Sequence, residues 1–413
     1  MRVRRVVVTG IETLNPCGLS IEETMYSLRR GKKGISKITR FPTERFRTSR
    51  AGQVFLPDGM LDHLPKDIKK ESDRFIHLGM LAAERAFVDS GLIITDANRD
   101  RIGVDASTGI GGITTIQHGA VQIMGEGKGF GPDAIRPRFI PGLIANALAA
   151  QISILLKLRG PSDCHTTACA ASLHSLQGAY DAIMMGRAVA MIVGGAETII
   201  CELGVGGFDA PRALSPVGHS TPFALGRNGF VIGEGATFLV LEELEHALAR
   251  GAHIYCEYSG SASTSDAHHM TNPAPGGDGL YRAMGLALDY AGLSSDVVGL
   301  VMAHGTSTPA GDIAETDALV ELFGHRGVAV SAIKGGMGHL LGASGATAAA
   351  VAAAILNGSK IPQNRYLDRL QVDPRCDGLW LKNLPTRLDK SSVMINAAAF
   401  GGQNVSCVFS KYQ

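Results

Sequence analysis

Four residues stand where a folded chain could use them for covalent chemistry: Cys169, His304, Lys334 and His339. Cys169 is flanked by alanines and opens an expected helix. Free N–H groups and the dipole at a helix start favour the thiolate and are expected to lower the thiol pKa. The small neighbours leave room for a substrate. Taken alone, however, such a cysteine is more often a buried, inert thiol.

The two histidines and the lysine follow predicted strands. His304 ends the apolar run 299–303, and the carboxyl ends of parallel strands are where α/β proteins place ligands. Three glycines lie between Lys334 and His339 in the sequence. They indicate that the backbone of this segment approaches another group closely. Each alone could be a capped core histidine or a surface lysine. Together with Cys169 they form a pattern that predicts one shared site.

The elements that must position these residues follow from the pattern of apolar residues and glycines. In the first half we predict strands that end at Gly10 and at Val104, a helix over 73–90 ended by Gly91, and an exposed Gly/Pro-rich loop over 125–137. Around Cys169 we predict a strand, a sharp turn, a helix to about Gly186 and a strand over 188–193 that closes at Gly194-Gly195.

The second half repeats this alternation. The predicted elements are strands 297–303, 328–333, 393–396 and 405–409 and helices 314–323 and 343–356. We therefore predict an α/β protein with two related βαβ halves that meet near residues 250–260 without a flexible linker.

Composition excludes several classes of function. The 413 residues carry 39 Lys+Arg and 38 Asp+Glu, a net charge of +1, which argues against a nucleic-acid binder. With 45% hydrophobic and 19% charged residues, the chain is not disordered. Its seven scattered cysteines contain no CxxC pair, so neither a metal site nor a disulfide framework is predicted.

Two segments bear on location. The basic start Met1–Arg5 precedes too short an apolar run for a signal peptide, and Ala346–Leu356 is shorter than the ~20 residues that span a bilayer. We expect a cytoplasmic protein without a membrane span.

The order of the motifs then shows a resemblance. Nearly end to end, the chain resembles the elongating β-ketoacyl-acyl-carrier-protein synthases, the thiolase-fold condensing enzymes of fatty acid and type II polyketide assembly. The initiating synthases of the same fold combine their catalytic cysteine with one His and one Asn. In this chain a second histidine, His339, stands in place of the Asn, which points to the elongating class. The motifs that carry the resemblance are Thr167-Ala168-Cys169, Gly204-Val205-Gly206-Gly207-Phe208, Gly233-Glu234-Gly235-Ala236, His304-Gly305-Thr306-Ser307-Thr308-Pro309-Ala310-Gly311-Asp312 and Gly338-His339-Leu340-Leu341-Gly342-Ala343.

The resemblance implies a thiolase-like fold of five αβαβα layers, with a half that carries the cysteine (1–255) and a half that carries the His/Lys cluster (256–413). It also implies that Cys169 holds the acyl chain as a thioester and that the N–H groups of Cys169 and Phe400 form an oxyanion hole. His304 and His339 would hold the malonyl thioester and its enolate. Lys334 would orient them and Asp312 would support them.

Further roles come from the same resemblance. Thr306 and Thr308 would bind the phosphopantetheine arm, and Phe208, Ile110 and Ala398 would contact substrate. Lys70 and Arg212 would dock an acidic acyl carrier protein, with Lys66 and Lys69 added for their proximity in sequence. No metal or redox cofactor is implied, because decarboxylation drives carbon–carbon bond formation.

The chain also departs from the family pattern. Ala348 stands where a glutamate is usual, nine residues after the second histidine, and Asn228 replaces an aspartate. Ala398 and Ala399 precede Phe400 where Phe and Gly are common, so different gating is expected. The 125–137 loop is a few residues longer than usual.

These departures favour the catalytic ketosynthase of a specialised polyketide or aryl polyene pathway. Housekeeping fatty acid elongation by a 3-oxoacyl synthase II is the alternative. A noncatalytic partner with the same fold is disfavoured because all four chemical residues are retained, and a degradative thiolase is disfavoured because Cys407 lies in an apolar strand. The expected partners are acyl carrier protein and either a second copy of this chain or a cysteine-free chain-length-factor homologue.

Overall fold

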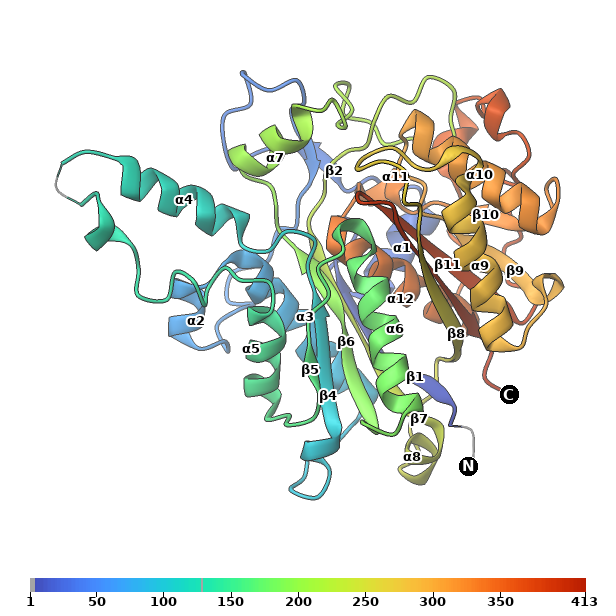
Figure 1. Cartoon of the computed structure of the whole chain (residues 1–413), viewed down its shortest axis with the longest axis horizontal. Coiled ribbons are helices and arrows are strands. Elements are labelled where there is room, and N and C mark those ends of the chain that lie inside the picture. Colours follow the sequence, from blue (N-terminus) through green and yellow to red (C-terminus); the bar gives the residue numbers. More distant parts are fainter. Residues whose placement is uncertain (1–3, 128) are drawn as a thin grey trace.

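In the computed structural model of the chain, which describes residues 4–127 and 129–413, ten strands form one continuous sheet (Figure 1). Its two halves of five strands meet at one seam and are called here the first and the second sheet. Met1–Val3 of the basic start and Lys128 of the predicted loop lie outside the described residues. The strands of the first sheet are β1 (Val6–Leu14), β4 (Ile102–Ser107), β5 (Ser162–Asp163), β6 (Ala190–Glu197) and β7 (Gly235–Glu243). Those of the second are β8 (Cys256–Ser265), β9 (Val298–Met302), β10 (Ala329–Ser331), β11 (Ser392–Ala399) and β12 (Gln403–Ser410).

The two sheets share one topology. The first has the spatial order β1-β7-β6-β4-β5 and the second the order β8-β12-β11-β9-β10, which is 1-5-4-2-3 when each set is numbered along the chain. In both, the first two pairings are antiparallel and the last two are parallel. The seam is the antiparallel pairing of residues 6–8 in β1 with 256–258 in β8. The predicted duplication is confirmed.

Helices complete the five layers. α3 (Arg74–Ser90) and α5 (Ala147–Leu156) cover the outer face of the first sheet. α9 (Asp278–Ala291) and α10 (Pro309–Phe323) cover that of the second. Between the sheets lie α6 (Ala171–Met184) and α12 (Ser344–Leu356), each in contact with strands of both (Figure 1).

The central layer explains why α12 is so rich in small residues. Every residue from Ser344 to Leu356 is buried, because the helix has a sheet on each side and α6 beside it. At Gly345 the two helices come so close that a Cβ would lie 2.6 Å from Cγ of Leu173. Small residues therefore let α6 and α12 begin side by side.

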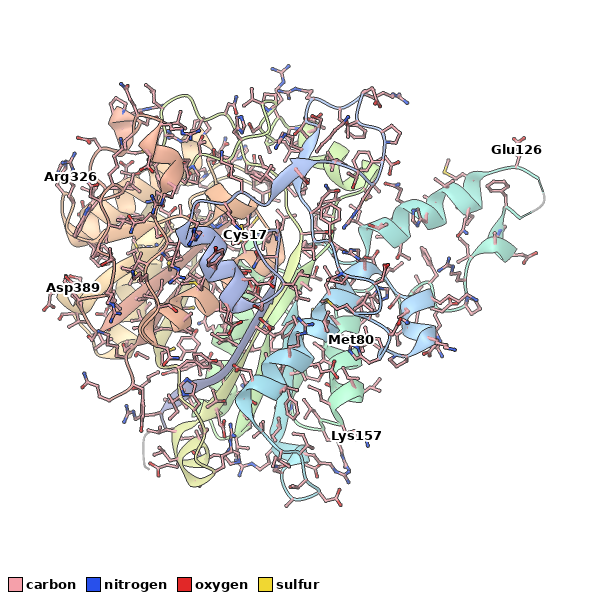
Figure 2. All side chains as sticks on the ribbon, turned by 180° about the vertical axis from the view of Figure 1, so that it is seen from behind. Cys17, Met80, Glu126, Lys157, Arg326 and Asp389 are labelled. Carbon is pink, nitrogen blue, oxygen red and sulfur yellow. The ribbon has the colours of Figure 1, made fainter. Side chains whose placement is uncertain are left out.

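Shorter elements surround this frame. They are α1 (Ile21–Arg29), α2 (Lys66–Glu71), α4 (Ile113–Met124), α7 (Glu202–Asp209), α8 (Leu244–Ala249), α11 (Lys334–Met337) and the hairpin β2 (Ile35–Lys37) and β3 (Arg50–Gly52). α4 and the segment after it project from the body as an arm, with Glu126 near its tip (Figures 1 and 2). The described residues of the predicted loop 125–137 are largely exposed, as expected.

Several element boundaries were predicted wrongly, and glycine is a common reason. β1 continues past Gly10, where a Cβ would lie 2.3 Å from the Ala86 carbonyl oxygen of α3. β6 likewise continues through Gly194, which packs against the Thr237 carbonyl of β7. These glycines permit close packing inside strands rather than turns. α10 begins at Pro309, five residues before the predicted start.

Candidate active site

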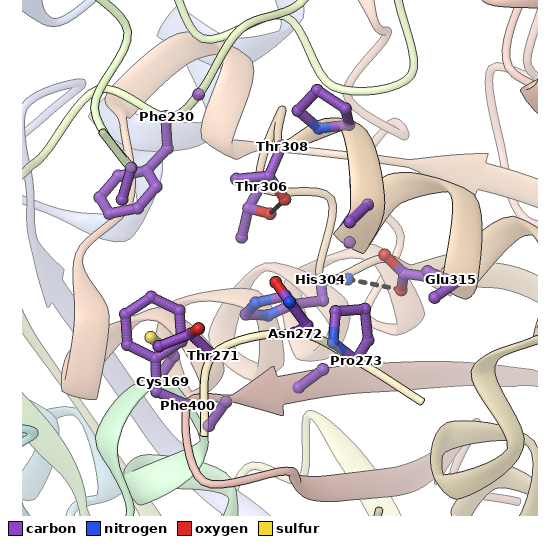
Figure 3. Close-up of a pocket in the computed structure, with 18 of the residues that line it drawn as sticks. Cys169, Phe230, Thr271, Asn272, Pro273, His304, Thr306, Thr308, Glu315 and Phe400 are labelled. Carbon is purple, nitrogen blue, oxygen red and sulfur yellow. Dashed lines mark hydrogen bonds between the residues drawn. The ribbon is translucent and has the colours of Figure 1, made fainter. Parts of the chain in front are cut away.

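Cys169 lies between β5 and α6, in a single 3₁₀ turn formed by residues 168–170. Ala168 has a left-handed φ of +49°, a conformation that a non-glycine residue adopts only when its surroundings impose it. The thiol is 8% exposed and lines a cavity of about 480 Å³ (Figure 3). The expected placement near a helix N-terminus is confirmed, since α6 begins at Ala171.

The electrostatics of Cys169 differ from the expectation. Burial raises the pKa of the thiol to about 12, and the Glu197 carboxylate adds to the rise, while the Lys334 ammonium opposes it. The predicted net lowering of this pKa at the helix start is therefore wrong. Loss of water around the sulfur outweighs the favourable positive charge.

His304 follows β9, and its backbone is held firmly. A carboxylate of α10, Glu315, accepts hydrogen bonds from the His304 N–H at 2.8 Å and the Gly305 N–H at 2.7 Å (Figure 3). Lys334, the first residue of α11, donates from Nζ to the His304 carbonyl oxygen. Burial lowers the Lys334 pKa to about 8, although the nearby acids favour its charged form. The lysine thus fixes the backbone of His304.

His339 lies just before α12, and its ring is perpendicular to that of His304 with centroids 5.4 Å apart. The Leu341 N–H donates to Nδ1 at 3.3 Å, and the Ser344 hydroxyl lies 2.9 Å from the same atom. Burial and the Lys334 charge keep the pKa of both histidines well below its usual value. In a neutral ring whose Nδ1 accepts, Nε2 carries the proton, so His339 presents an N–H donor at Nε2.

The segment between His304 and α10 carries the two predicted threonines and the aspartate. Thr306 and Thr308 line the cavity, with their hydroxyls 3.0 Å apart (Figure 3). Asp312 is fully buried outside the cavity lining and accepts from the backbone N–H groups of Ser307 and Phe223 at 3.0 and 2.7 Å. Its carboxylate thereby shapes the turn without facing the cavity.

Aromatic side chains close one side of the cavity. Phe400 lies at the tip between β11 and β12, 38% exposed, and stacks on Phe208 of α7 with ring centroids 6.3 Å apart. Phe230 packs edge-on against both Phe208 and His339, at 5.8 and 5.2 Å. Ala398 also lines the cavity. A continuous aromatic row therefore runs from the Phe400 tip to His339.

The remaining predicted residues are dispersed. Arg212 lines the cavity with a left-handed φ of +59°, whereas Ile110 and Lys70 are not among its lining residues. Ile110 is 40% exposed. Lys70 lies in the last turn of α2, and the neighbouring Lys69 pairs with Asp62 at 3.0 Å.

Sequence reasoning missed several residues of the site. Glu315 and Phe230 belong to it, as do Asp266 and His269 in the loop after β8. The signal for Glu315 was available, because an acid among the alanines 314 and 318 of a predicted helix needs a partner if that face is buried. The approach of the Asp266 loop to the Phe400 tip, where the Gly401 N–H donates to the Met270 carbonyl at 2.8 Å, is a tertiary contact without a local signal.

Across residues 4–127 and 129–413, no group of three or more His, Cys, Asp or Glu could hold a metal ion. Within those same ranges, no helix combines the length and apolar composition that crossing a membrane requires. All seven cysteines are free, and all except the half-buried Cys164 are buried.

A duplicated five-layer fold brings a thiol and a neutral imidazole close to the starts of its two central helices and adds a second neutral imidazole from the turn after β9. This arrangement defines a thiolase-fold condensing enzyme. Two family descriptions match the chain: Beta-ketoacyl synthase, N-terminal domain over residues 3–247, and Beta-ketoacyl synthase, C-terminal domain over residues 255–368. The chain belongs to the beta-ketoacyl synthase family.

Relatives and solved structures agree with this assignment. The chain is 40% identical over 416 residues to 3-oxoacyl-(acyl-carrier-protein) synthase 2 of Staphylococcus aureus strain N315, covering 99% of both chains. It superposes with a TM-score of 0.90, at 33% identity and full coverage of both chains, on the ishigamide ketosynthase/chain length factor. A type II PKS acyl-carrier protein in complex with its ketosynthase bound to the hexaketide gives 0.90 at 29% identity, also with full coverage of both chains.

Proposed function

We propose that the chain extends an acyl chain, held as a thioester on Cys169, by decarboxylative condensation with malonyl-acyl-carrier protein. The observation that carries this proposal is the meeting of the Cys169 thiol with His304 and His339 in one cavity. A thioester acceptor and two neutral N–H donors are the groups that such a reaction needs.

The proposed reaction has two stages. In the first, the Cys169 sulfur attacks the acyl thioester of the carrier protein, and the phosphopantetheine thiol leaves. In the second, malonyl thioester enters the same cavity and loses carbon dioxide. The resulting carbanion attacks the Cys169 thioester, which forms the new carbon–carbon bond and releases the cysteine.

The geometry suggests a role for each group in these stages. Nε2–H of His339 and the ring of His304 would bind the thioester oxygen as it gains enolate charge. The N–H groups of Cys169 and Phe400 would form the oxyanion hole for acyl transfer. Thr306 and Thr308 would hydrogen-bond the phosphopantetheine arm. The carrier protein brings the substrates on this arm, and the reaction uses no metal or redox cofactor. Lys334 and Asp312 would act through the His304 segment that they fix.

The test is a condensation assay with purified chain, acyl-loaded carrier protein and malonyl-carrier protein. We expect one carbon dioxide for each 3-oxoacyl product, identified by mass spectrometry on the carrier. Decarboxylation without a condensed product would contradict the proposal, and the absence of both carbon dioxide release and product would favour the noncatalytic alternative.

We assign the chain to a specialised polyketide or aryl polyene pathway. Ala398 in place of a ring beside Phe400 supports this assignment, since it widens the cavity for stiff substrates. One similar solved structure is a type II PKS ketosynthase by its description, and another is described as a ketosynthase/chain length factor. Housekeeping elongation remains the alternative, because the curated relatives are 3-oxoacyl synthases 2.

One substitution separates the two pathways. Ala398→Phe is expected to slow elongation of a rigid polyene substrate about tenfold more than that of a saturated chain of equal length, because a ring restores bulk at the mouth. Equal slowing of both, or a wild type that accepts only saturated chains, would return the chain to fatty acid elongation.

The proposed protein partners are the carrier protein and a second ketosynthase-fold chain. β5 is the unpaired edge of the first sheet, and the arm exposes apolar side chains, with Met124 82% and Val121 61% exposed. Unpaired edges and clustered apolar side chains favour association. Native mass spectrometry of the chain, alone and co-expressed with a cysteine-free homologue, would distinguish a homodimer from a heterodimer.

Two further assignments keep the status of proposals. A division at residues 255/256 is supported by the start of β8 at Cys256 and by the repeated topology. Cytoplasmic location stays a prediction from the sequence.

A further inference from the structure

Glu197, the last residue of β6, is a fully buried carboxylate that the reaction proposed above does not use. It accepts hydrogen bonds from the Thr108 hydroxyl at 2.9 Å, the Gly109 N–H at 2.7 Å and the Gly342 N–H at 3.1 Å. All three donors are neutral. A buried carboxylate held only by neutral donors is costly, which argues for a specific task at this position.

Two of the donors belong to the turn after β4, which packs beside the nucleophile, and the third belongs to the segment of the second histidine. A Cβ on Gly109 would lie 2.7 Å from Glu197 Oε2 and 3.3 Å from the carbonyl oxygen of Ala168, the residue before Cys169. Gly342 follows Leu341, whose N–H donates to His339. Glu197 therefore ties the Thr108–Gly109 turn, which packs against the turn of Cys169, to the turn of His339.

The turn of Cys169 and the turn of His339 each contain one strained residue. Ala168 has φ of +49° and Leu341 has φ of +48°, left-handed values that persist only when neighbouring groups fix them. The fit is tight, because a Cβ on Gly342 would lie 2.3 Å from the Gly109 nitrogen. Only glycines at these two positions let both N–H groups reach one carboxylate oxygen.

The carboxylate also acts on the thiol through its charge. Among the groups that shift the Cys169 pKa, Glu197 raises it and Lys334 lowers it. Burial raises the Glu197 pKa itself to about 7, and its three hydrogen bonds favour the charged form.

We propose that Glu197 is a positioning residue for condensation: its carboxylate locks the Thr108–Gly109 turn, against which Ala168 packs, to the Leu341–Gly342 turn, and so holds the thiol opposite His339. This inference rests on the proposed function for its reaction, but the placement of the charge beside Cys169 can be tested without any substrate.

The experiment compares Glu197→Gln with the wild type and with a matched control, Glu242→Gln. Glu242 of β7 is equally buried, but it binds Arg250, His246 and Thr9 away from the cavity. Two readouts are taken: the rates of acyl loading and condensation, and the pH profile of Cys169 alkylation by iodoacetamide, followed by mass spectrometry of the Cys169 peptide.

We expect Glu197→Gln to lower both rates by about 10- to 100-fold, the size of effect of a misplaced reacting group. The midpoint of Cys169 alkylation should move to lower pH, because a negative charge has been removed. Glu242→Gln should leave both readouts within about twofold of the wild type. Unchanged rates, an unchanged midpoint, or an equal loss in Glu242→Gln would overturn the proposal.

Two precautions keep the outcomes distinct. If Glu197→Gln does not fold, Glu197→Asp replaces it, which keeps the charge but shortens the reach. Glu197→Asp should lower both rates but leave the alkylation midpoint at its wild-type pH. Wild-type rates in Glu197→Asp would overturn the proposal. If the wild type itself does not condense malonyl units, the proposed function fails, while the alkylation profile still reports on Glu197.

Discussion

The two halves of the molecule share a topology but contribute different chemistry. In the N-terminal half the turn after the third strand, β5, carries Cys169, while the turn after the second, β4, carries only Thr108 and Gly109. In the C-terminal half both corresponding turns carry chemistry: His304 follows β9, and Lys334 and His339 follow β10. Duplication therefore allows one half to supply the nucleophile and the other to supply the donors for the carbanion.

The halves also stabilise their turns in parallel ways. Glu315 accepts from the backbone N–H groups of His304 and Gly305 after β9, and Glu197 accepts from Gly109 after β4. The crossover between second and third strands differs most: it spans 108–161 with the projecting arm in the first half, but only 303–328 in the second. A buried acid under each turn is common to both halves, whereas the arm is an addition to one.

The largest expected effect removes the contribution of the N-terminal half. Cys169→Ala should lower condensation by at least about 1,000-fold with the fold intact, because no other group accepts the acyl chain. Intact-protein mass spectrometry would show whether acyl groups still load onto the variant. Loading and elongation at wild-type rates would place the nucleophile elsewhere.

The next effect removes the contribution of the C-terminal half. His304→Ala and His339→Ala should each lower malonyl decarboxylation by about 100- to 1,000-fold, since each removes a donor to the developing oxyanion. Acyl loading of Cys169 should fall far less. Separate assays of loading and of carbon dioxide release decide this point, and equal losses in both would remove the division of labour between the halves.

A smaller effect concerns pH. Because burial lowers the Lys334 pKa to about 8, its ammonium is charged below that pH and loses its proton above it. Condensation should therefore decline by up to about tenfold per unit as pH rises past 8. Lys334→Arg, whose charge persists, should lack this decline. A wild-type profile that is flat through pH 8 would contradict the assigned charge.

The smallest expected effect is at the cavity mouth. Arg212→Glu should lower the apparent affinity for an acidic carrier protein about 3- to 10-fold at low salt, and the difference should shrink as salt screens the charges. The same measurement on Lys70→Glu, a charge reversal outside the cavity lining, serves as the comparison. An unchanged salt dependence in Arg212→Glu would misplace the docking surface.

The sequence predicted the duplicated α/β architecture because apolar strands and glycine-ended helices recur in both halves. It identified Cys169, His304, Lys334 and His339 because polar residues at strand and helix ends are a local pattern. The predicted strand ends at Gly10 and Gly194 are wrong, because a glycine can either end a strand or permit close packing within it. At both positions the glycine permits close packing.

Other features depend on contacts between distant segments. Nothing near Glu197 indicates that its donors come from residues 108–109 and 342. The high Cys169 pKa also follows from burial by other elements, whereas the helix start visible in the sequence favours the opposite direction. Only the folded chain decides which term is larger.

The central layer has a consequence for the order in which the chain acquires its structure during synthesis. The inner face of the first sheet is covered by α6 and also by α12, which contacts β1 and β7 but ends only at residue 356. A ribosome adds about 5–20 residues per second, so this apolar face waits on the order of ten seconds after β7 is made. The first half thus keeps part of its apolar inner face uncovered until its last helix arrives from the second.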